Sequence, residues 1–358
     1  MRATCAVVLA AGEGTRMRSP RPKPLHLLCG RPMASFILDA VGDAQATFVV
    51  VGHGANWVEK ELRERHGDTL SFVEQSEQLG TGHAVATALP SILDAVGDAD
   101  VDVVILPGDT PLLRRATLAE LVSRHQESQA AMTVLSAVLE DPSGYGRIVR
   151  DRDGRFTRIV EERDASAEER QIREVNTSVM VVRAALLGPG LRRVGRQNAQ
   201  HEYYLTDLVA VLHEAGHATD AVAVEDVLEV MGVNDRSQLA AAEREMRRRI
   251  NERWMQRGVT MWDPLATYVD ADVELAADVS LLPGTVLRGR TRVAAGAVIG
   301  PHAYLEDVTV GEGARLATVT ATRARVGAHA HVDAYVVLDA GTVVDDSAHV
   351  TPGEHRSA

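Results

Sequence analysis

A glycine-containing loop near the start of the chain has the residue types that bind phosphate groups. It reads Leu9-Ala-Ala-Gly-Glu-Gly-Thr-Arg-Met17 and follows a short apolar run. Gly12 and Gly14 would let the backbone approach a ligand closely, so that successive N–H groups surround phosphate oxygens. Arg16 and Lys23 are near enough in sequence to bind the same phosphates. A turn that carries surface cations is the alternative interpretation.

This loop differs from two other glycine motifs for nucleotides. A Walker loop requires Gly-Lys followed by Ser or Thr, and the dinucleotide fingerprint requires a third small residue where Met17 stands. The formal net charge is −12, yet residues 1–33 contain six basic side chains and one acidic one. A local cationic segment in an acidic protein fits a small anionic ligand better than a nucleic acid. An ordinary solvated loop is the alternative.

A second segment, Gln75-Ser-Glu-Gln-Leu-Gly-Thr-Gly-His83, has groups that could recognise a base. The amides of Gln75 and Gln78 offer paired donors and acceptors that suit a pyrimidine edge. Gly80 would expose backbone beside the start of a helix. His83 falls in the first turn of that helix with no partner evident in the sequence, so a structural role is favoured over general-base chemistry.

A third segment places a carboxylate after a hydrophobic run. Asp109 follows Val103–Leu106 and the dipeptide Pro107-Gly108. A carboxylate at the carboxyl end of a strand in an open α/β sheet is a position for a hard divalent cation. Asp109 could equally cap the helix that follows.

The elements that would position these residues alternate between strand and helix from Cys5 to about Val233. Expected strands are Cys5–Ala11, Thr47–Val51, Val101–Leu106 and Val179–Val182, and expected helices are Met33–Val41, Trp57–His66, Gly82–Val96 and Thr117–Gln129. Apolar runs of this length are typical of buried strands. The order predicts an α/β fold with a mostly parallel open sheet and ligands at its carboxyl edge.

The chain changes character after this part. Residues 236–257 lack Gly and Pro and are rich in Ala, Glu and Arg, and this composition predicts a solvated connecting helix. The Arg247–Arg249 run is interpreted as a solvated face of that helix. From Val269 an apolar residue recurs every six positions through Leu305, resumes at Val310 and Leu316 after a one-residue slip, and returns after a longer break at Val326, Val332, Leu338 and Val344. Hexapeptide periodicity of this kind predicts a parallel β-helix.

The length and composition of the chain limit the class of protein further. The 358 residues, 45% of them hydrophobic, suffice for two domains. Two cysteines, Cys5 and Cys29, show no metal-ligand spacing and fit a reducing compartment, so we expect a cytoplasmic location. No apolar run approaches 18 residues, and the chain start is interpreted as a buried strand and not as a signal peptide.

Taken together, these motifs resemble those of the bifunctional N-acetylglucosamine-1-phosphate uridylyltransferase/glucosamine-1-phosphate acetyltransferase family. The resemblance extends to about residue 310 and is dense in the first 235 residues. It is carried by Leu9–Met17 with Lys23, Gln75–His83, Gly108-Asp109, Gly144–Ile148, Ile159–Glu161, Val175–Thr177, Asn198–Asp207 and Gly232–Asn234. It implies a Rossmann-like nucleotidyltransferase domain (1–235), a connecting arm helix (236–262), a left-handed parallel β-helix (263–352) that forms a homotrimer, and a tail (353–358).

The resemblance also implies a reaction and a set of residue roles. The reaction is Mg²⁺-dependent transfer of a nucleotidyl group to a sugar-1-phosphate with release of pyrophosphate. UTP is the favoured donor and N-acetylglucosamine-1-phosphate the favoured acceptor. The nucleotide site would comprise Leu9, Ala10, Ala11, Gly12, Gly14, Gln75, Gly80 and Thr81, with Arg16 and Lys23 as the catalytic cations. Asp109 and Asn234 would hold Mg²⁺, although Asp235 is chemically as capable. Gly146, Glu161, Asn176 and Thr206 would line the sugar. The attacking phosphate is already an anion, so no protein nucleophile is required.

The chain departs from the family pattern in two places. Its β-helix lacks the Arg-x-Arg-Pro-Gly, Ala-Gly-His-Leu and Asn-Tyr-Asp-Gly stretches and the basic arm of the acetyltransferase part, so we expect no acetyl transfer. Ser178 stands where the family usually has Gly after Asn-Thr or Asn-Ala. Ser178 could narrow the sugar pocket, add a hydrogen bond or have no effect. A specialised paralogue that uses another sugar or cyclitol phosphate, and another nucleotide, is therefore an alternative.

Two other classes of function fit the sequence less well. A non-catalytic sugar-nucleotide sensor or scaffold would be expected to lose phosphate- or metal-binding positions, yet Arg16, Lys23, Asp109 and Asn234 are all present. A hexapeptide-repeat acyltransferase would need a histidine in a suitable coil. His302, His329 and His331 occur without the surrounding motif of that family.

Overall fold

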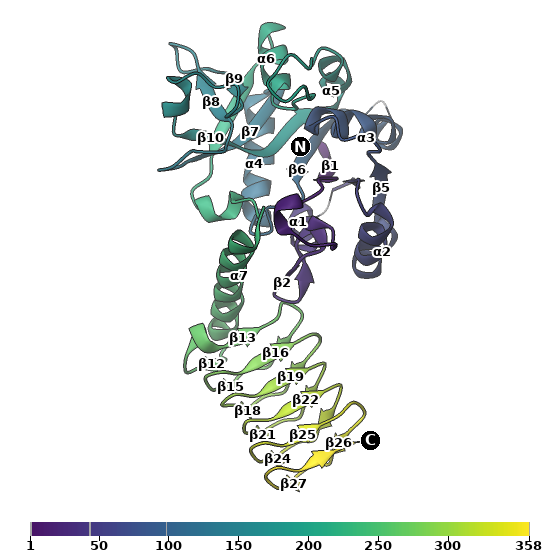
Figure 1. Cartoon of the computed structure of the whole chain (residues 1–358), viewed down its shortest axis with the longest axis vertical. Helices are drawn as coiled ribbons and strands as arrows, with labels where there is room; N and C mark the ends of the chain where they lie inside the picture. The colour runs from purple at the N-terminus through teal and green to yellow at the C-terminus, as the bar shows by residue number, and fades with distance from the viewer. Residues whose placement is uncertain (1, 43, 98, 358) are drawn as a thin grey trace. The chain divides into compact units, whose positions relative to one another are not determined.

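The computed structural model describes residues 2–42, 44–97 and 99–357. The chain divides into two units (Figure 1). The first comprises Met1–His26 and Pro32–Gln238, and the second comprises Leu27–Arg31 and Leu239–Ala358. Each unit is described by itself below.

A nine-stranded sheet forms the centre of the first unit, with the order β11-β7-β10-β6-β1-β4-β5 and with β8 and β9 attached through β10. The strands are β1 (Ala3–Ala10), β4 (Ala46–Val51), β5 (Leu70–Glu74), β6 (Val101–Pro107), β7 (Met132–Val138), β8 (Arg147–Arg150), β9 (Phe156–Val160), β10 (Glu174–Arg183) and β11 (Thr219–Ala223). β1 lies between β4 and β6 and is parallel to both. The α/β class with a mostly parallel sheet is thus confirmed.

Helices cover both faces of this sheet. They are α1 (Met33–Val41), α2 (Ala55–His66), α3 (Thr81–Val96), α4 (Arg115–Ser128), α5 (Ala184–Leu191) and α6 (Asp207–Glu214). Successive side chains of a strand point to opposite faces. Val7 therefore joins the apolar cluster that includes α3, α5 and α6, while its neighbour Val8 joins the cluster that includes α1, α2 and α4.

β10 departs from the parallel arrangement. The expected strand Val179–Val182 is the second half of β10, which runs antiparallel to both β6 and β7. Its register shifts between Asn176 and Met180, and Ser178 in that interval has a φ of 63°. A bulge of this kind bends a strand and redirects its side chains. β5, β7, β8, β9 and β11 were not expected from the sequence.

The second unit contains three parallel sheets that stack coil upon coil, the arrangement of a left-handed β-helix (Figure 1). The first sheet comprises β12 (Thr260–Met261), β15 (Ser280–Leu281), β18 (Val298–Ile299), β21 (Arg315–Leu316), β24 (His331–Val332) and β27 (His349–Val350). The second comprises β13 (Tyr268–Val269), β16 (Val286–Arg288), β19 (Tyr304–Glu306), β22 (Thr320–Thr322), β25 (Val337–Leu338) and β28 (His355–Arg356). The third comprises β14 (Glu274–Leu275), β17 (Arg292–Val293), β20 (Thr309–Val310), β23 (Arg325–Val326) and β26 (Val343–Val344).

The hexapeptide pattern predicts which side chains of each coil point inward. Leu281, Leu287, Ile299 and Leu305 are all fully buried in one apolar cluster. The expected break between Leu316 and Val326 was wrong, because β22 continues the stack with Ala321 at the inward position. Alanine is a weak marker of an apolar repeat, which explains why the coil was missed.

Three further elements complete the strands and α-helices of the described residues. β2 (Leu27–Leu28) and β3 (Arg31–Pro32) are short strands, and α7 (Arg236–Gln256) is a long helix. Cys5 and Cys29 are buried and free. Within the described residues, no helix combines the length and the hydropathy that a membrane span requires.

The β-helix core generates a stability prediction. Leu287→Ala should lower the free energy of unfolding by about 2–5 kcal/mol, because it removes a fully buried side chain and leaves a cavity. Arg292→Ala, on the next strand along the chain, is the control, since the Arg292–Glu274 ion pair is more than half exposed and such pairs contribute little. Urea unfolding followed by circular dichroism measures both. Equal stability of the two variants would contradict the inward assignment of Leu287.

Candidate active site

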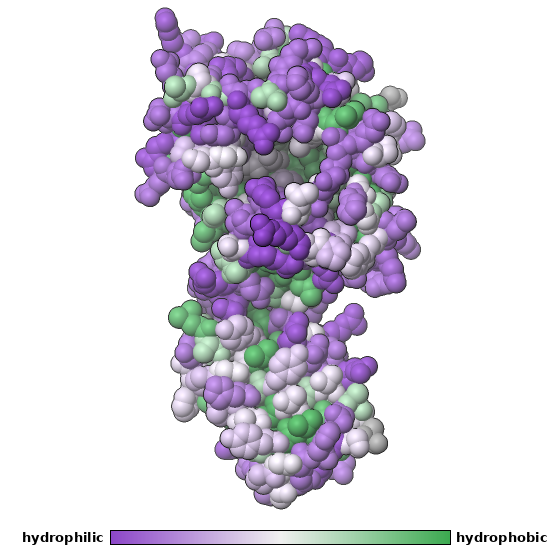
Figure 2. All heavy atoms as spheres, in the orientation of Figure 1, coloured by the Kyte–Doolittle hydropathy of each residue, from purple (hydrophilic) through white to green (hydrophobic). Residues whose placement is uncertain are grey.

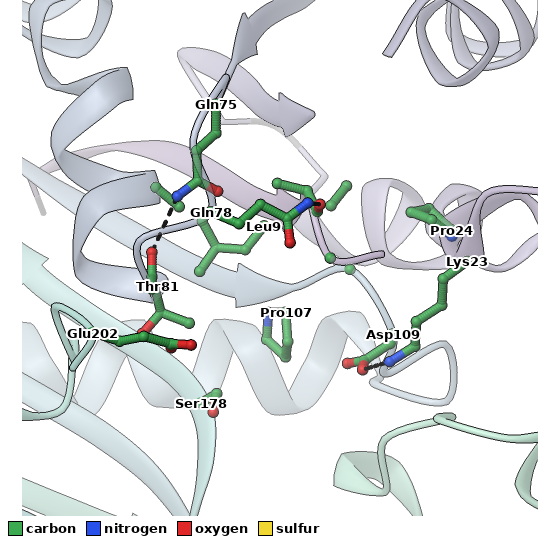
Figure 3. A pocket seen from close by; sticks show the side chains of 16 residues that line it. Leu9, Lys23, Pro24, Gln75, Gln78, Thr81, Pro107, Asp109, Ser178 and Glu202 are labelled. Atoms are coloured by element: carbon green, nitrogen blue, oxygen red, sulfur yellow. Dashed lines mark hydrogen bonds and ion pairs between the residues drawn. The ribbon is translucent and has the colours of Figure 1, made fainter. Parts of the chain in front are cut away.

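A cavity of about 300 Å³ opens at the carboxyl ends of β1 and β6. The surface of the first unit is hollowed near its middle, with hydrophobic residues in the hollow and hydrophilic ones around it (Figure 2). The cavity is lined by Leu9, Ala10, Ala11, Gly12, Lys23, Pro24, Gln75, Gln78, Gly80, Thr81, Ala84, Pro107, Gly108, Asp109, Ser178 and Glu202. Thr81, Ser178 and Glu202 lie toward one side of it, and Lys23 and Asp109 toward the other (Figure 3).

The loop after β1 supplies the backbone wall of this cavity. Gly14 has a φ of 63°, and a Cβ at that position would lie 2.6 Å from Lys23 Cβ. A side chain at residue 14 would therefore push the lysine stem away from the cavity. Arg16 lies in the short 3₁₀ turn Thr15–Met17, is exposed and is not among the lining residues, so the structure does not bring it to the cavity.

Lys23 connects the two residues expected to hold a metal. Its ammonium forms an ion pair with Asp109 and donates to Asn234 Oδ1 at 2.7 Å. The backbone N–H of Val233 donates to the Asp109 carbonyl at 2.8 Å and so places Asn234 beside Asp109. A carboxylate and an amide oxygen thus meet at a point that a cation already occupies. Hard divalent cations prefer such oxygen ligands, so the donor set fits a metal of this class.

Asp235, the other metal-ligand candidate, has a different role. Its Oδ1 accepts from the backbone N–H of Gln238 at 2.8 Å, and Gln238 Oε1 accepts from the backbone N–H of Asn234 at 2.7 Å. This reciprocal pair is an N-terminal helix cap, and it leads into α7. Asn234 is therefore the residue of the two that contacts the Lys23–Asp109 pair.

The glutamine segment forms the opposite wall. Gln75 is buried, and its Nε2 donates to the Gly80 carbonyl at 3.2 Å and lies 3.0 Å from His83 Nδ1. His83 thus orients the Gln75 amide, which agrees with the structural role expected for it. Gln78 Nε2 donates to the Ala11 carbonyl at 2.8 Å. This bond joins the glutamine segment to the Leu9–Met17 loop, which is expected to bind phosphate and is called the phosphate-type loop below.

A second cavity, of about 230 Å³, shares Leu9, Thr81, Ser178 and Glu202 with the first. Its other lining residues are Glu161, Met180, Gln200, Tyr204, Leu205 and Thr206. Of the four residues expected at the sugar, Glu161 and Thr206 line this cavity, and Thr206 Oγ1 donates to Glu161 Oε1 at 2.9 Å. Gly146 and Asn176 are not lining residues. They are neighbours in the sheet, because the Asn176 N–H donates to the Gly146 carbonyl at 2.8 Å.

Ser178 is the side chain at the junction of the two cavities. Its backbone N–H donates to Asn176 Oδ1 at 2.9 Å, which supports the left-handed conformation of the bulge. That conformation costs a non-glycine residue roughly 1–2 kcal/mol. Asn176 therefore acts on the cavities through the backbone of Ser178.

The second cavity has an acidic character. Burial raises the pKa of Glu161, the hydrogen bond from Thr206 opposes that shift, and Asp207 and Asp164 add to it. Burial, with the nearby Asp164 and Glu161 carboxylates, raises the pKa of Tyr204 to about 12, so its hydroxyl stays protonated. A protonated phenol and a carboxylate together can donate to and accept from a ligand with several hydroxyl groups.

Some lining residues were not selected from the sequence. Glu202, Gln200 and Tyr204 belong to the segment 198–207, which carried the resemblance without an individual role for these residues. Polar residues in a loop give no signal of direction by themselves. The structure brings this segment to the cavity, where Thr81 Oγ1 accepts from the Leu205 N–H at 3.1 Å, and no feature of the sequence indicated that contact.

Comparison with known proteins agrees with this geometry. Residues 6–152 match the family model described as MobA-like NTP transferase domain. The bifunctional protein GlmU of Desulfitobacterium hafniense is 44% identical over 348 residues, which cover 96% of this chain and 74% of that protein. The protein of the same name from Kineococcus radiotolerans is 47% identical over 338 residues, 94% of this chain and 68% of that protein.

The chain belongs to the GlmU family. It is a sugar-1-phosphate nucleotidyltransferase, and its family generally uses a divalent metal. The similarity extends further than the sequence motifs indicated. An alignment over 96% of the chain includes coils of the β-helix beyond residue 310, so the expected limit of the resemblance was too short.

The Asn234–Asp235 pair generates a prediction about the metal. Asn234→Ala should weaken the apparent affinity for Mg²⁺ by at least the roughly 10- to 100-fold that loss of an outer-sphere partner costs. Asp235→Ala should keep the same dependence on divalent metal as the wild type and lose about 1 kcal/mol of stability, because it removes a helix cap. Pyrophosphate release against Mg²⁺ concentration and urea unfolding measure the two effects. A wild-type Mg²⁺ midpoint in the Asn234 variant would overturn its assignment.

Glu161 generates a prediction about pH and stability. Its folded pKa is raised, so the folded state binds its proton more tightly than the unfolded state. The free energy of unfolding of the wild type, relative to Glu161→Gln, should therefore fall as pH rises from the ordinary pKa of 4.5 through the raised value. Urea unfolding from pH 3 to 7 would measure this difference.

Glu169 is the matched control of opposite sign. The Ser166 backbone and Arg158 lower the pKa of Glu169 to about 2. Relative to Glu169→Gln, the wild type should therefore gain stability as pH rises toward 4.5. The same slope for both substitutions would contradict the buried environment of Glu161.

Proposed function

We propose that this chain catalyses Mg²⁺-dependent transfer of a uridylyl group from UTP to N-acetylglucosamine-1-phosphate, with release of pyrophosphate. The observation that carries the proposal is the convergence of Lys23, Asp109 and Asn234 beside a cavity that also contains Gln75. A cation-binding group, a phosphate-type loop and a base-recognition amide in one cavity fit a nucleoside triphosphate. The contiguous second cavity fits a hydroxyl-rich acceptor.

We propose the following roles for the site residues, which this geometry supports in part. Leu9, Ala10, Ala11, Gly12 and Gly14 form the loop around the nucleotide, and Gln75, Gly80 and Thr81 recognise its base. A phosphate oxygen of the sugar phosphate attacks the α-phosphorus of UTP, a new P–O bond forms, and the bond to pyrophosphate breaks. Lys23 neutralises charge on the triphosphate. Arg16 belongs to the catalytic set if substrate draws its exposed side chain toward the phosphates.

The metal proposal rests on Asp109 and Asn234. When bound, Mg²⁺ would supply positive charge to the phosphates during the displacement. The Lys23 ammonium stands between the same two oxygens, so it has to leave them for the metal to bind there. Its release would make the lysine available to the phosphates, and a single movement would couple metal binding to substrate binding.

The sugar would lie in the second cavity. Glu161 and Thr206 would contact the sugar through their side chains, whereas Gly146 and Asn176 would shape the wall of the cavity through the backbone. Because these 358 residues lack the acetyltransferase motifs named above, we propose nucleotidyl transfer and no acetyl transfer for them. We further propose the domain division 1–235, 236–262, 263–352 and 353–358, assembly as a homotrimer through the β-helix, and a cytoplasmic location.

Substrate specificity tests the proposal. The wild type should release pyrophosphate fastest with UTP and N-acetylglucosamine-1-phosphate, in a grid of five nucleoside triphosphates against that sugar, glucose-1-phosphate and cyclitol phosphates. Lys23→Ala should lower the rate by about 10²–10³, because it removes charge stabilisation of the transition state. No release with any pair would favour the non-catalytic scaffold.

Ser178→Gly is the control for the acceptor. Under this proposal it changes the KM for the sugar phosphate by less than the roughly 10- to 200-fold that one misplaced group in a pocket costs, and it keeps the order of substrates. A fast reaction of the wild type with another sugar or cyclitol phosphate, reversed by Ser178→Gly, would establish the specialised paralogue instead.

A further inference from the structure

Three side chains on the outside of the β-helix form a cluster with metal-ligating chemistry. They are His331 and Asp333 in one coil and His349 in the next, and their ligand atoms all lie within 4.8 Å of one another. His331 Nε2 lies 3.4 Å from Asp333 Oδ1, and His349 Nε2 lies 2.8 Å from Asp333 Oδ2. Both histidines therefore direct the same ring nitrogen at one carboxylate.

The backbone of the β-helix sets this arrangement. β24 and β27 are neighbours in the same sheet, and His331 lies directly opposite His349 in a parallel register (Figure 1). The His331 N–H donates to the Ala348 carbonyl at 2.8 Å, and the Asp333 N–H donates to the Val350 carbonyl at 3.0 Å. The two imidazole rings lie 5.3 Å apart, between centroids, with an angle of 31° between their planes. Ligands on paired strands are held more firmly than ligands on a loop.

Side-chain exposure leaves room for solvent at the cluster. The side chains of His331, Asp333 and His349 are 55%, 28% and 57% exposed. Water could therefore complete the coordination of an ion held by the three protein ligands. Arg315 precedes His331 in the same ladder and is itself exposed, so solvent screens its charge.

We propose that His331, Asp333 and His349 bind a divalent transition metal of the zinc class. Two imidazoles and one carboxylate are a ligand set that zinc, copper and nickel accept, whereas magnesium prefers oxygen ligands alone. The site is separate in chemistry from the oxygen site at Asp109 and Asn234. A bound ion would link the coil of β24 to the coil of β27 and stabilise their stacking.

The next hexapeptide provides a natural comparison. Six residues further along, Val337, Asp339 and His355 occupy the equivalent positions, with Val337 opposite His355 in the sheet. His355 Nε2 lies 2.8 Å from Asp339 Oδ2, as His349 does from Asp333. This second group is a histidine–aspartate ion pair with valine in place of the second histidine. It is a matched control that lacks one of the three ligands.

Isothermal titration of the full chain with ZnCl₂, in excess Mg²⁺ to fill the oxygen site, tests the proposal. The wild type should bind one more zinc ion per chain than the double variant His331→Ala/His349→Ala. Asp333→Asn should weaken that binding by more than about tenfold, since loss of an outer-sphere partner alone costs roughly 10- to 100-fold. Zinc should raise the urea midpoint of the wild type and leave that of the double variant unchanged.

Two matched variants serve as controls for the zinc stoichiometry. His355→Ala should keep the wild-type zinc stoichiometry, and Val337→His should add a second site of similar affinity. Equal zinc binding by the wild type and the double variant would overturn the proposal, as would loss of the extra ion in His355→Ala. The exposed positions of the two histidines make unfolding of the double variant a minor concern, and circular dichroism checks it.

Discussion

The site of the first unit depends on one ammonium group held between two oxygens. Lys23 meets Asp109 from 86 residues away and Asn234 from 211 residues away along the chain, so the contact exists only when the sheet is complete. Pairing of β1 with β6, which places Leu9 opposite Pro107, brings the phosphate-type loop beside Asp109. The backbone bond from Val233 to Asp109 then adds Asn234. Because a buried or half-buried carboxylate is costly without a partner, the lysine also keeps this edge of the sheet stable while no substrate is bound.

Local signals in the sequence were sufficient for much of the fold. The helix expected at Met33–Val41 has those bounds, since Pro32 precedes it and Gly42 follows it with a φ of 66°. Cavity residues close to strand ends, such as Gly12 and Asp109, could be predicted because parallel strands deliver their following residues to one edge. Arg16 could not be placed this way. Proximity to Lys23 in sequence indicated a shared ligand, but Gly14 and Arg18 both adopt left-handed conformations around the Thr15–Met17 turn, and Arg16 is exposed.

The polar half of β10 shows a different limit of sequence reasoning. The apolar run Val179–Val182 identifies the buried end of the strand, whereas the bulge between Asn176 and Met180 breaks the period that would reveal the rest. Ser178 was noticed as a replacement of a usual glycine, and its φ of 63° supplies the physical reason why glycine suits the position. The strand thus carries an unfavourable conformation at the junction of two cavities, where the direction of one side chain decides how they connect.

The two units bring distant side chains together by different means, and this affects how easily each can acquire a site. Lys23, Asp109 and Asn234 converge through three separate segments, so all three must be correct at once. In the β-helix, a residue on an outward position stacks on its counterpart in the next coil, and hydrogen bonds keep that register even where a coil is shortened. Arg315 pairs with His331 across sixteen residues, and His331 pairs with His349 across eighteen. A pair of ligands therefore requires only two substitutions in register. The Asp339–His355 group differs from the His331–Asp333–His349 cluster only in that valine, Val337, stands in place of the first histidine.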